Sequence, residues 1–215
     1  MAKKLLIFIG LSVCFCGVLI AVYAMSSNTV EDAGEDVSAN VKEPPFKLPE
    51  ISLGNPQAPH TVIMYFALDC AHCREYEDKI LPEIKKQFID TGEMRFILYD
   101  CSGNPLGFLA SKVSWAKRDP QQYLVMLKKL FARQEYWNVT DGYKKRLLEV
   151  SGLTEQEFND CINDQDLDDA IMWKRFQAKE IAAVPTFVID GEQIDEIMKP
   201  DVFISFRDKK QKSGG

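Results

Sequence analysis

Two cysteines separated by two residues, Cys70 and Cys73, are the side chains whose types and spacing are best suited to chemistry. They follow an apolar run at 62–68 that predicts a buried strand, and a charged, helical pattern comes after them. Cys70 is thus expected at a helix N-terminus, where free N–H groups and the helix dipole favour a thiolate. His72, when protonated, favours the thiolate further. Cys70 is the candidate nucleophile, and Cys73 can close a disulfide with it.

The cysteine motif has two other interpretations. A pair of cysteines can be half of a zinc site, with Cys101 and Cys161 as the other ligands. Structural zinc sites usually take their second pair at close spacing, and these two cysteines are far apart in the chain. A chance pair with no chemical role is disfavoured because the strand before it and the helix after it are the context that redox chemistry requires. No metal and no cofactor is therefore expected.

Composition and charge limit the classes of protein that the sequence can represent. The chain has 215 residues and a formal net charge of −6, which disfavours a nucleic-acid-binding surface. After an N-terminal segment and a linker are set aside, the remainder fits one domain of common size. One domain with a hydrophobic core is the expectation.

The N-terminal residues predict export from the cytoplasm. Lys3 and Lys4 precede an apolar run from Leu5 to Tyr23, so residues 1–24 are expected to be a cleaved signal peptide or an uncleaved membrane anchor. Residues 25–53 are rich in polar and acidic residues and proline, which predicts a flexible linker. This linker is too short for a dimerisation domain, so a monomer is expected.

The folded part, residues 54–210, begins with a β-α-β pattern. His60–Leu68 reads as a strand, the helix after the cysteines runs to about Asp90 with a kink at Pro82, and Met94–Tyr99 reads as a second, parallel strand. Residues from about 103 to 180 are helical throughout. The tryptophans are expected in this helical core, with the alternative that one lines the substrate groove: Trp115, Trp137 and Trp173.

The C-terminal part predicts a hairpin and a helix. A strand starts directly after Pro185, and Asp190-Gly191 is a two-residue turn into a second strand. A last helix begins at Pro200. The fold class is therefore α/β, with an all-helical insertion between the β-α-β unit and the C-terminal hairpin and helix.

With these elements in this order, the chain resembles the thioredoxin superfamily and, more narrowly, the DsbA family of bacterial thiol–disulfide oxidoreductases. The resemblance is carried by Leu53-Gly54-Asn55-Pro56, Cys70-Ala71-His72-Cys73, the helical insertion and Val184-Pro185. The resemblance implies that Pro185 is cis, that Val184 and Pro185 bind substrate beside the active-site sulfurs, and that Ala71 belongs to the catalytic motif. Family members often have proline where Ala71 stands, and a buried glutamate where this chain has Met64. The usual proton acceptor for Cys73 is thus expected to be missing or replaced by water.

The resemblance implies a periplasmic thiol oxidase that donates its Cys70–Cys73 disulfide to exported, reduced proteins. It also implies an inner-membrane, quinone-linked partner that reoxidises the enzyme. Two alternatives remain open: an isomerase or reductase with the same residues, and a non-catalytic protein displayed at the cell surface as an antigen.

The remaining cysteines of the exported chain, Cys101 and Cys161, are either bonded to each other or free thiols. Closing a loop of about 60 residues would stabilise the fold by roughly 4 kcal/mol if the geometry is unstrained. Family members can carry a second, non-catalytic disulfide from the Cys161 region to the first inserted helix. That helix has Ala116 near the expected position, so the partner would have shifted to Cys101.

Overall fold

The computed structural model describes residues 43–213 of the chain. The predicted signal peptide or anchor at 1–24 and the linker residues before 43 lie outside the described residues. In chain order, the elements are β1 (Ile51–Leu53), β2 (His60–Phe66), α2 (Ala71–Lys79), α3 (Leu81–Ile84), a short π-helix η2 (Lys85–Ile89), β3 (Met94–Asp100), α4 (Pro105–Ser114), α5 (Pro120–Ala132), α6 (Gln134–Trp137), α7 (Tyr143–Ser151), α8 (Glu155–Ile162), α9 (Gln165–Gln177), β4 (Thr186–Ile189), β5 (Glu192–Ile194) and α10 (Pro200–Ser213).

The strands form one five-stranded sheet in the order β1-β3-β2-β4-β5, with β2 at its centre. β2 pairs with β3 in parallel, as the β-α-β prediction required, and with β4 antiparallel. β4 and β5 form the predicted hairpin around Asp190 and Gly191, both of which have positive φ. The strand that leads into the cysteine motif, β2, is therefore hydrogen-bonded to a neighbouring strand on both sides.

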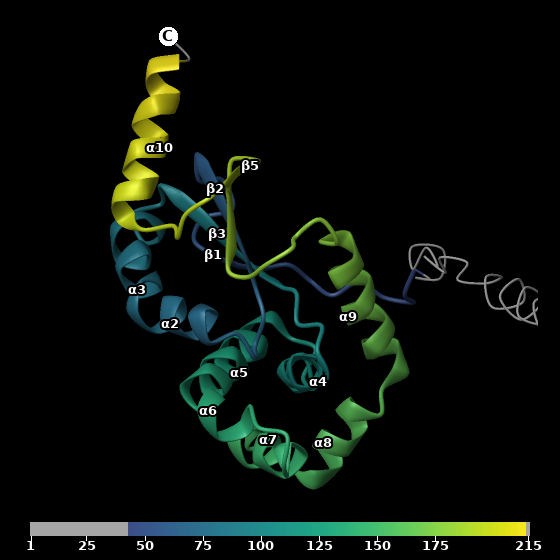
Figure 1. The fold of residues 1–215 in the computed structure, drawn as a ribbon. Coiled ribbons are helices and arrows are strands. Elements are labelled where there is room, and N and C mark those ends of the chain that lie inside the picture. The colour runs from purple at the N-terminus through teal and green to yellow at the C-terminus, as the bar shows by residue number, and fades with distance from the viewer. Residues whose placement is uncertain (1–42, 214–215) are drawn as a thin grey trace, which may run out of the picture. The chain divides into compact units, whose positions relative to one another are not determined.

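Helices cover the sheet on the face to which β2 turns its buried side chains (Figure 1). Tyr76 of α2 packs against Phe96 of β3 and Phe187 of β4, and Phe203 of α10 packs against Phe88 of η2. The long helix expected after the cysteines is interrupted at Ile80, because Pro82 cannot donate a backbone hydrogen bond and instead occupies the first turn of α3. The predicted kink is confirmed.

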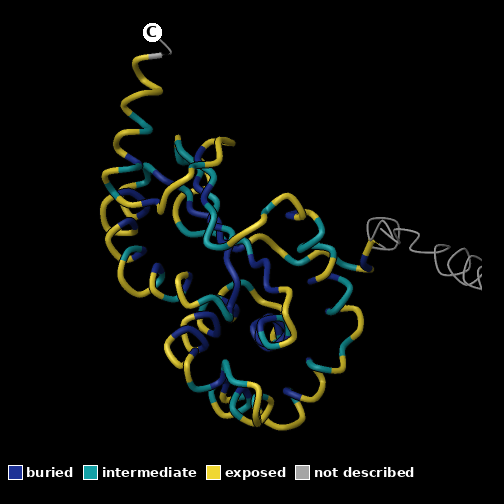
Figure 2. Tube along the Cα trace, in the orientation of Figure 1, coloured by how far each residue is buried: buried dark blue, intermediate teal, exposed yellow. Residues whose placement is uncertain are grey.

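The predicted helical insertion is present as α4 to α9. Helix α4 contacts α5, α7, α8 and α9, and Figure 2 shows it as the most deeply buried helix of this group. Thr154 and Glu157 form the reciprocal hydrogen bonds of a capping box at the start of α8. Trp115 and Trp137 are fully buried in this subdomain as predicted, whereas Trp173 of α9 is only half-buried.

One predicted boundary is wrong. The expected linker extended to residue 53, but β1 lies inside it and pairs antiparallel with β3, with Ile51 opposite Leu98. Phe46 and Leu48 also pack against the hydrophobic core. These residues are structured because the backbone of β1 forms hydrogen bonds with β3 and the apolar side chains pack against the core. Both partners lie far away in the sequence.

Candidate redox-active site

Cys70 caps the N-terminus of α2, as predicted. The strand β2 ends at Phe66, a short turn follows, and the extended backbone of Cys70 (φ −80°, ψ 116°) directs its Sγ back toward the first turn of the helix. The backbone N–H of Cys73 donates a hydrogen bond to this sulfur at 3.2 Å. Because the first N–H groups of a helix have no partner within the helix, a thiolate at this position satisfies one of them and meets the positive end of the dipole.

The pKa of Cys70 is lowered to about 7 by this surrounding. The largest cause is the hydrogen bond with the Cys73 thiol; backbone N–H groups of Cys73 and His72 lower the pKa as well, while partial burial opposes them. The charge of His72 is the smallest of these contributions. His72 lies exposed, with its Nδ1 3.9 Å from Oε2 of Glu75. Its predicted influence on the Cys70 thiolate therefore has the right sign but is weaker than that of the helix N-terminus.

Cys73 has the opposite environment. Its side chain is fully buried in the core, one turn inside α2, and burial raises the pKa of its thiol far above the ordinary range. The structure thus contains an accessible sulfur that ionises near neutral pH beside a buried one that stays protonated. This asymmetry is what a dithiol needs if incoming thiols are to react with one sulfur only.

The Val184-Pro185 segment lies against Cys70, as the resemblance implied. The peptide bond between the two residues is cis, and the Cys70 thiol donates to the carbonyl oxygen of Val184 over 3.6 Å. The segment is held there because β4 begins at the next residue, Thr186, which pairs with Tyr65 of β2. The sequence-predicted residues of the site are thus brought together, and Ala71, which follows Cys70 in the chain, is exposed.

The turn that carries Cys70 is held by three side chains that sequence reasoning missed, two from the helical subdomain and one from the loop after β3. The buried Gln134 of α6 donates through Nε2 to the carbonyl oxygens of Leu68 at 2.7 Å and Cys70 at 3.0 Å. Asn138 donates to the Asp69 carbonyl at 3.0 Å, and Ser102 accepts from the Leu68 N–H at 2.9 Å. All the partners are backbone groups, so no pattern in the sequence indicates these contacts.

An acidic residue lies beside the motif, although not where the family usually has one. Met64 of β2 is buried and apolar. Asp69, the residue before Cys70, is among the groups whose negative charge raises the pKa of Cys73. One oxygen of Asp69 accepts a hydrogen bond from Asn104, and the other is buried without a partner. Gly107 makes room for it, since a Cβ at that position would lie 2.1 Å from Oδ1.

Cys101 and Cys161 are both buried free thiols in this structure. Cys101 follows β3, and its carbonyl oxygen accepts a hydrogen bond from Arg175 at 3.0 Å, whereas the Cys161 thiol donates to the Phe158 carbonyl at 3.2 Å. Burial raises the pKa of Cys101 to about 12 and that of Cys161 to about 11. Of the two arrangements expected for this pair, the structure describes the one with free thiols.

The zinc interpretation required these two thiols beside the cysteine motif. Within residues 43–213, no group of three or more histidine, cysteine or acidic side chains is gathered in a way that could hold a metal ion.

Comparison with known proteins agrees with this geometry. Residues 47–208 match a family model described as thioredoxin. A relative from Rickettsia bellii, provisionally named a protein-disulfide oxidoreductase, is 25% identical over 158 residues, which cover 70% of this chain and 61% of that protein. Disulfide bond formation protein D of Bacillus subtilis is 32% identical over 112 residues, covering 50% of this chain and 48% of the relative. The chain thus spans about three-fifths or less of the length of these two relatives.

Among solved structures, α-DsbA1 of Wolbachia pipientis superimposes with a TM-score of 0.64 at 26% sequence identity. The superposition covers 80% of this chain and 94% of the other. The likeness therefore extends over both the sheet and the helical insertion. The chain belongs to the thioredoxin family, and its fold is the one seen in the DsbA proteins of that family.

Proposed function

We propose that this protein is a thiol oxidase of the periplasm, which donates its Cys70–Cys73 disulfide to exported proteins. The observation that carries the proposal is the unequal pair of sulfurs: Cys70 accessible at a helix N-terminus with its pKa lowered to about 7, and Cys73 buried and protonated. The lowered pKa means that the thiolate is stabilised in the reduced enzyme. The reduced form is therefore favoured, and the disulfide is a stronger oxidant than it would be if the Cys70 thiol had its ordinary pKa.

The reaction takes two exchange steps. A substrate thiolate attacks the Cys70 sulfur of the disulfide, a mixed disulfide forms, and Cys73 leaves and takes up a proton. A second substrate thiolate then attacks the substrate sulfur of the mixed disulfide, and Cys70 leaves as the thiolate. The substrate loses two electrons and the enzyme gains them. Asp69 disfavours a negative charge on Cys73, and so supports its return to the protonated thiol.

The exposed side of the Val184-Pro185 segment would bind the substrate as an extended chain, since Val184 already places a carbonyl against Cys70. The substrates would be reduced, unfolded polypeptides that carry paired cysteines. Export would depend on residues 1–24, and reoxidation on a quinone-linked partner in the inner membrane. Within residues 43–213, no helix is long and apolar enough to cross a membrane.

A second candidate function is a reductase or isomerase with the same residues, and one observation favours it. A pKa of about 7 for Cys70 is close to the value of about 7 known for thioredoxin and well above the roughly 3.5 of DsbA. Less stabilisation of the thiolate makes the disulfide a weaker oxidant, because the reduced form gains less from it.

The redox potential separates these candidates. Equilibration of the purified protein with glutathione, read by alkylation of Cys70, should give a potential nearer the roughly −120 mV of DsbA than the roughly −270 mV of thioredoxin. In parallel, the oxidised protein should convert a reduced two-cysteine peptide to its disulfide, while Cys73→Ala should stop at the mixed disulfide. A potential at the thioredoxin end, with a stable dimer in sedimentation, would contradict the oxidase and favour the isomerase.

A further inference from the structure

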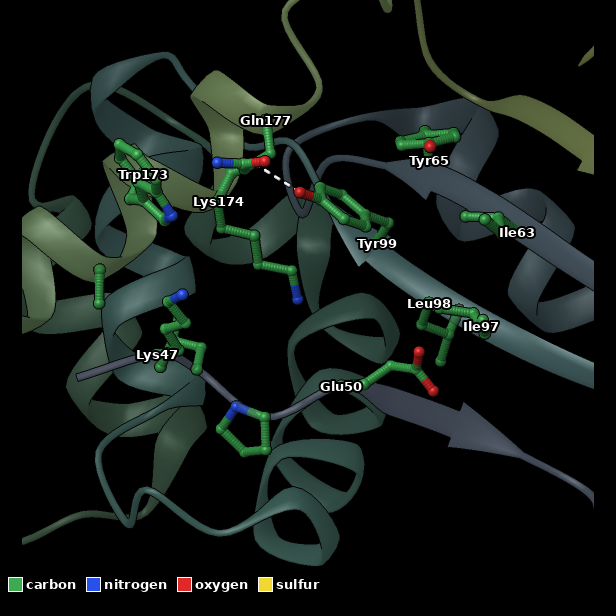
Figure 3. Close-up of a pocket in the computed structure, with 13 residues that line it drawn as sticks. Lys47, Glu50, Ile63, Tyr65, Ile97, Leu98, Tyr99, Trp173, Lys174 and Gln177 are labelled. Atoms are coloured by element: carbon green, nitrogen blue, oxygen red, sulfur yellow. Dashed lines mark hydrogen bonds between the residues drawn. The ribbon is translucent and has the colours of Figure 1, made fainter. Parts of the chain in front are cut away.

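A cavity of about 420 Å³ lies between β2, β3 and α9, away from the cysteine motif (Figure 3). Its walls come from the sheet face opposite α2, from α9 and from the segment before β1. Its volume is within the range of small-molecule sites, about 300–1,000 Å³. The lining residues that bear on ligand binding are Ile63, Tyr65, Tyr99, Trp173 and Lys174, together with Leu48.

The cavity is built on fixed elements. The Tyr99 hydroxyl donates to the Lys174 carbonyl oxygen at 2.7 Å, which holds α9 to β3 at the cavity wall (Figure 3). Arg175 makes a second hydrogen bond from α9 to the chain just after β3, at the Cys101 carbonyl. The cavity is therefore preformed, and a ligand would not have to separate the helix from the sheet.

Lys174 places a positive charge in this cavity, and the carboxylates of Asp100 and Glu50 act on it only from beyond ion-pair distance. Its side chain extends between the two walls in Figure 3, and burial lowers its pKa. Among the described residues, the Lys174 ammonium forms no ion pair and donates no hydrogen bond; it lies over the Tyr99 ring, 5.0 Å from the centroid. A desolvated ammonium in such a place is costly unless an anion accompanies it.

The other charges at the rim are already paired. Glu50 forms an ion pair with Arg95, and Lys47 forms one with Glu43 at 2.9 Å. Across the described part of the chain, Lys174 is thus the cavity charge that lacks an ion-pair partner, and a ligand can supply one. The remaining wall is mainly apolar and aromatic, with Ile63 and Trp173 on opposite sides in Figure 3. A complementary ligand has one negative group and an apolar body.

We propose that this cavity binds a small carboxylate with an aliphatic or aromatic body, with the carboxylate on Lys174 and the apolar part against the tyrosine and tryptophan rings. The site is separate from the thiol chemistry, because the cavity is lined by none of the residues of the cysteine motif or the Val184-Pro185 segment. The proposal does not depend on the redox role of the protein.

Titration calorimetry with decanoate tests the proposal on the purified protein. Decanoate should bind with 1:1 stoichiometry, and Lys174→Met should weaken it by roughly tenfold or more, as expected for loss of a charge-assisted hydrogen bond. Lys174→Arg keeps the charge and should bind within a few-fold of the wild type. Lys179→Met is the matched control, since that lysine is exposed just beyond α9 and contacts the Phe176 ring instead.

Decanol and methyl decanoate have the apolar chain of decanoate but no negative charge. They test the role of the charge without a mutation, so the proposal stays testable even if Lys174→Met does not fold. Both should bind at least tenfold more weakly than decanoate. Decanoate should also change the fluorescence of the wild type but not of Trp173→Phe, because Trp115 and Trp137 are buried elsewhere. Equal binding of decanol and decanoate, no loss in a folded Lys174→Met, or no decanoate binding at millimolar concentration would overturn the proposal.

Discussion

Replacing Gln134 by leucine should destabilise the fold through the turn that carries Cys70. Leucine fills a similar volume but leaves the carbonyl oxygens of Leu68 and Cys70 without the hydrogen bonds at 2.7 and 3.0 Å. An orphaned buried acceptor costs about 1–3 kcal/mol. The Cys70 carbonyl still accepts a hydrogen bond from the Arg74 N–H at 3.1 Å, so the carbonyl of the fully buried Leu68 is the acceptor that is orphaned. We expect a loss of roughly 1–3 kcal/mol in the free energy of unfolding.

Urea denaturation of the reduced protein, followed by circular dichroism, measures this loss, and the slope with urea should stay unchanged. At about 2–4 °C per kcal/mol for a domain of this size, the melting temperature should fall by roughly 2–12 °C. Gln121→Leu is the control, because Gln121 is exposed on α5 and its loss should change the free energy by less than about 0.5 kcal/mol. If both variants unfold within about 0.5 kcal/mol of each other, Gln134 does not anchor the turn and the reasoning fails.

Further predictions concern the cysteines. Cys70→Ala should abolish disulfide exchange with a peptide, whereas Cys73→Ala should accumulate mixed disulfides on Cys70. If gel analysis instead showed mixed disulfides trapped on Cys73 in the Cys70→Ala variant, the roles of the two cysteines would be reversed. Alkylation of Cys70 should rise with pH around a midpoint of about 7. Because this pKa is depressed from the ordinary value of about 8.5, the thiolate stabilises the reduced fold most fully above about pH 8.5, and that contribution is lost as the pH falls through about 7. His72→Ala should raise the midpoint only slightly, and a return to the ordinary thiol value would show that the histidine dominates. In non-reduced protein, mass spectrometry should find Cys101 and Cys161 alkylated only after unfolding, and absence of label there would indicate that they are bonded to each other.

The part of the site that could be predicted from the sequence is the part encoded in consecutive residues. An apolar run followed by two cysteines and a charged helix determines the position of Cys70, because the helix N-terminus is a local feature. The cis bond before Pro185 was expected from the family resemblance and is confirmed. The capping box at Thr154 was visible because its two partners are three residues apart.

The missed features depend on contacts between distant parts of the chain. Gln134 stands between Arg133 and Glu135, as a surface residue would, and only the approach of α6 to the Cys70 turn makes it buried. The strand β1 has three residues, too few to show a period, and pairs with residues more than forty positions later. Trp173 was expected in the helical core, but its side of α9 lines the cavity instead.

The two outer strands of the sheet bear on whether unfolded polypeptides can associate with the protein by strand addition. Within the described residues, the sheet ends on one side in β1 and on the other in β5, and each has three residues. β5 also carries an exposed glutamate and glutamine. Short, polar edges offer few free backbone groups to an incoming strand, which limits association by strand addition. If the protein is the proposed oxidase, an unfolded polypeptide bound at the Val184-Pro185 segment would not add a sixth strand, and it would be released without the two chains aggregating.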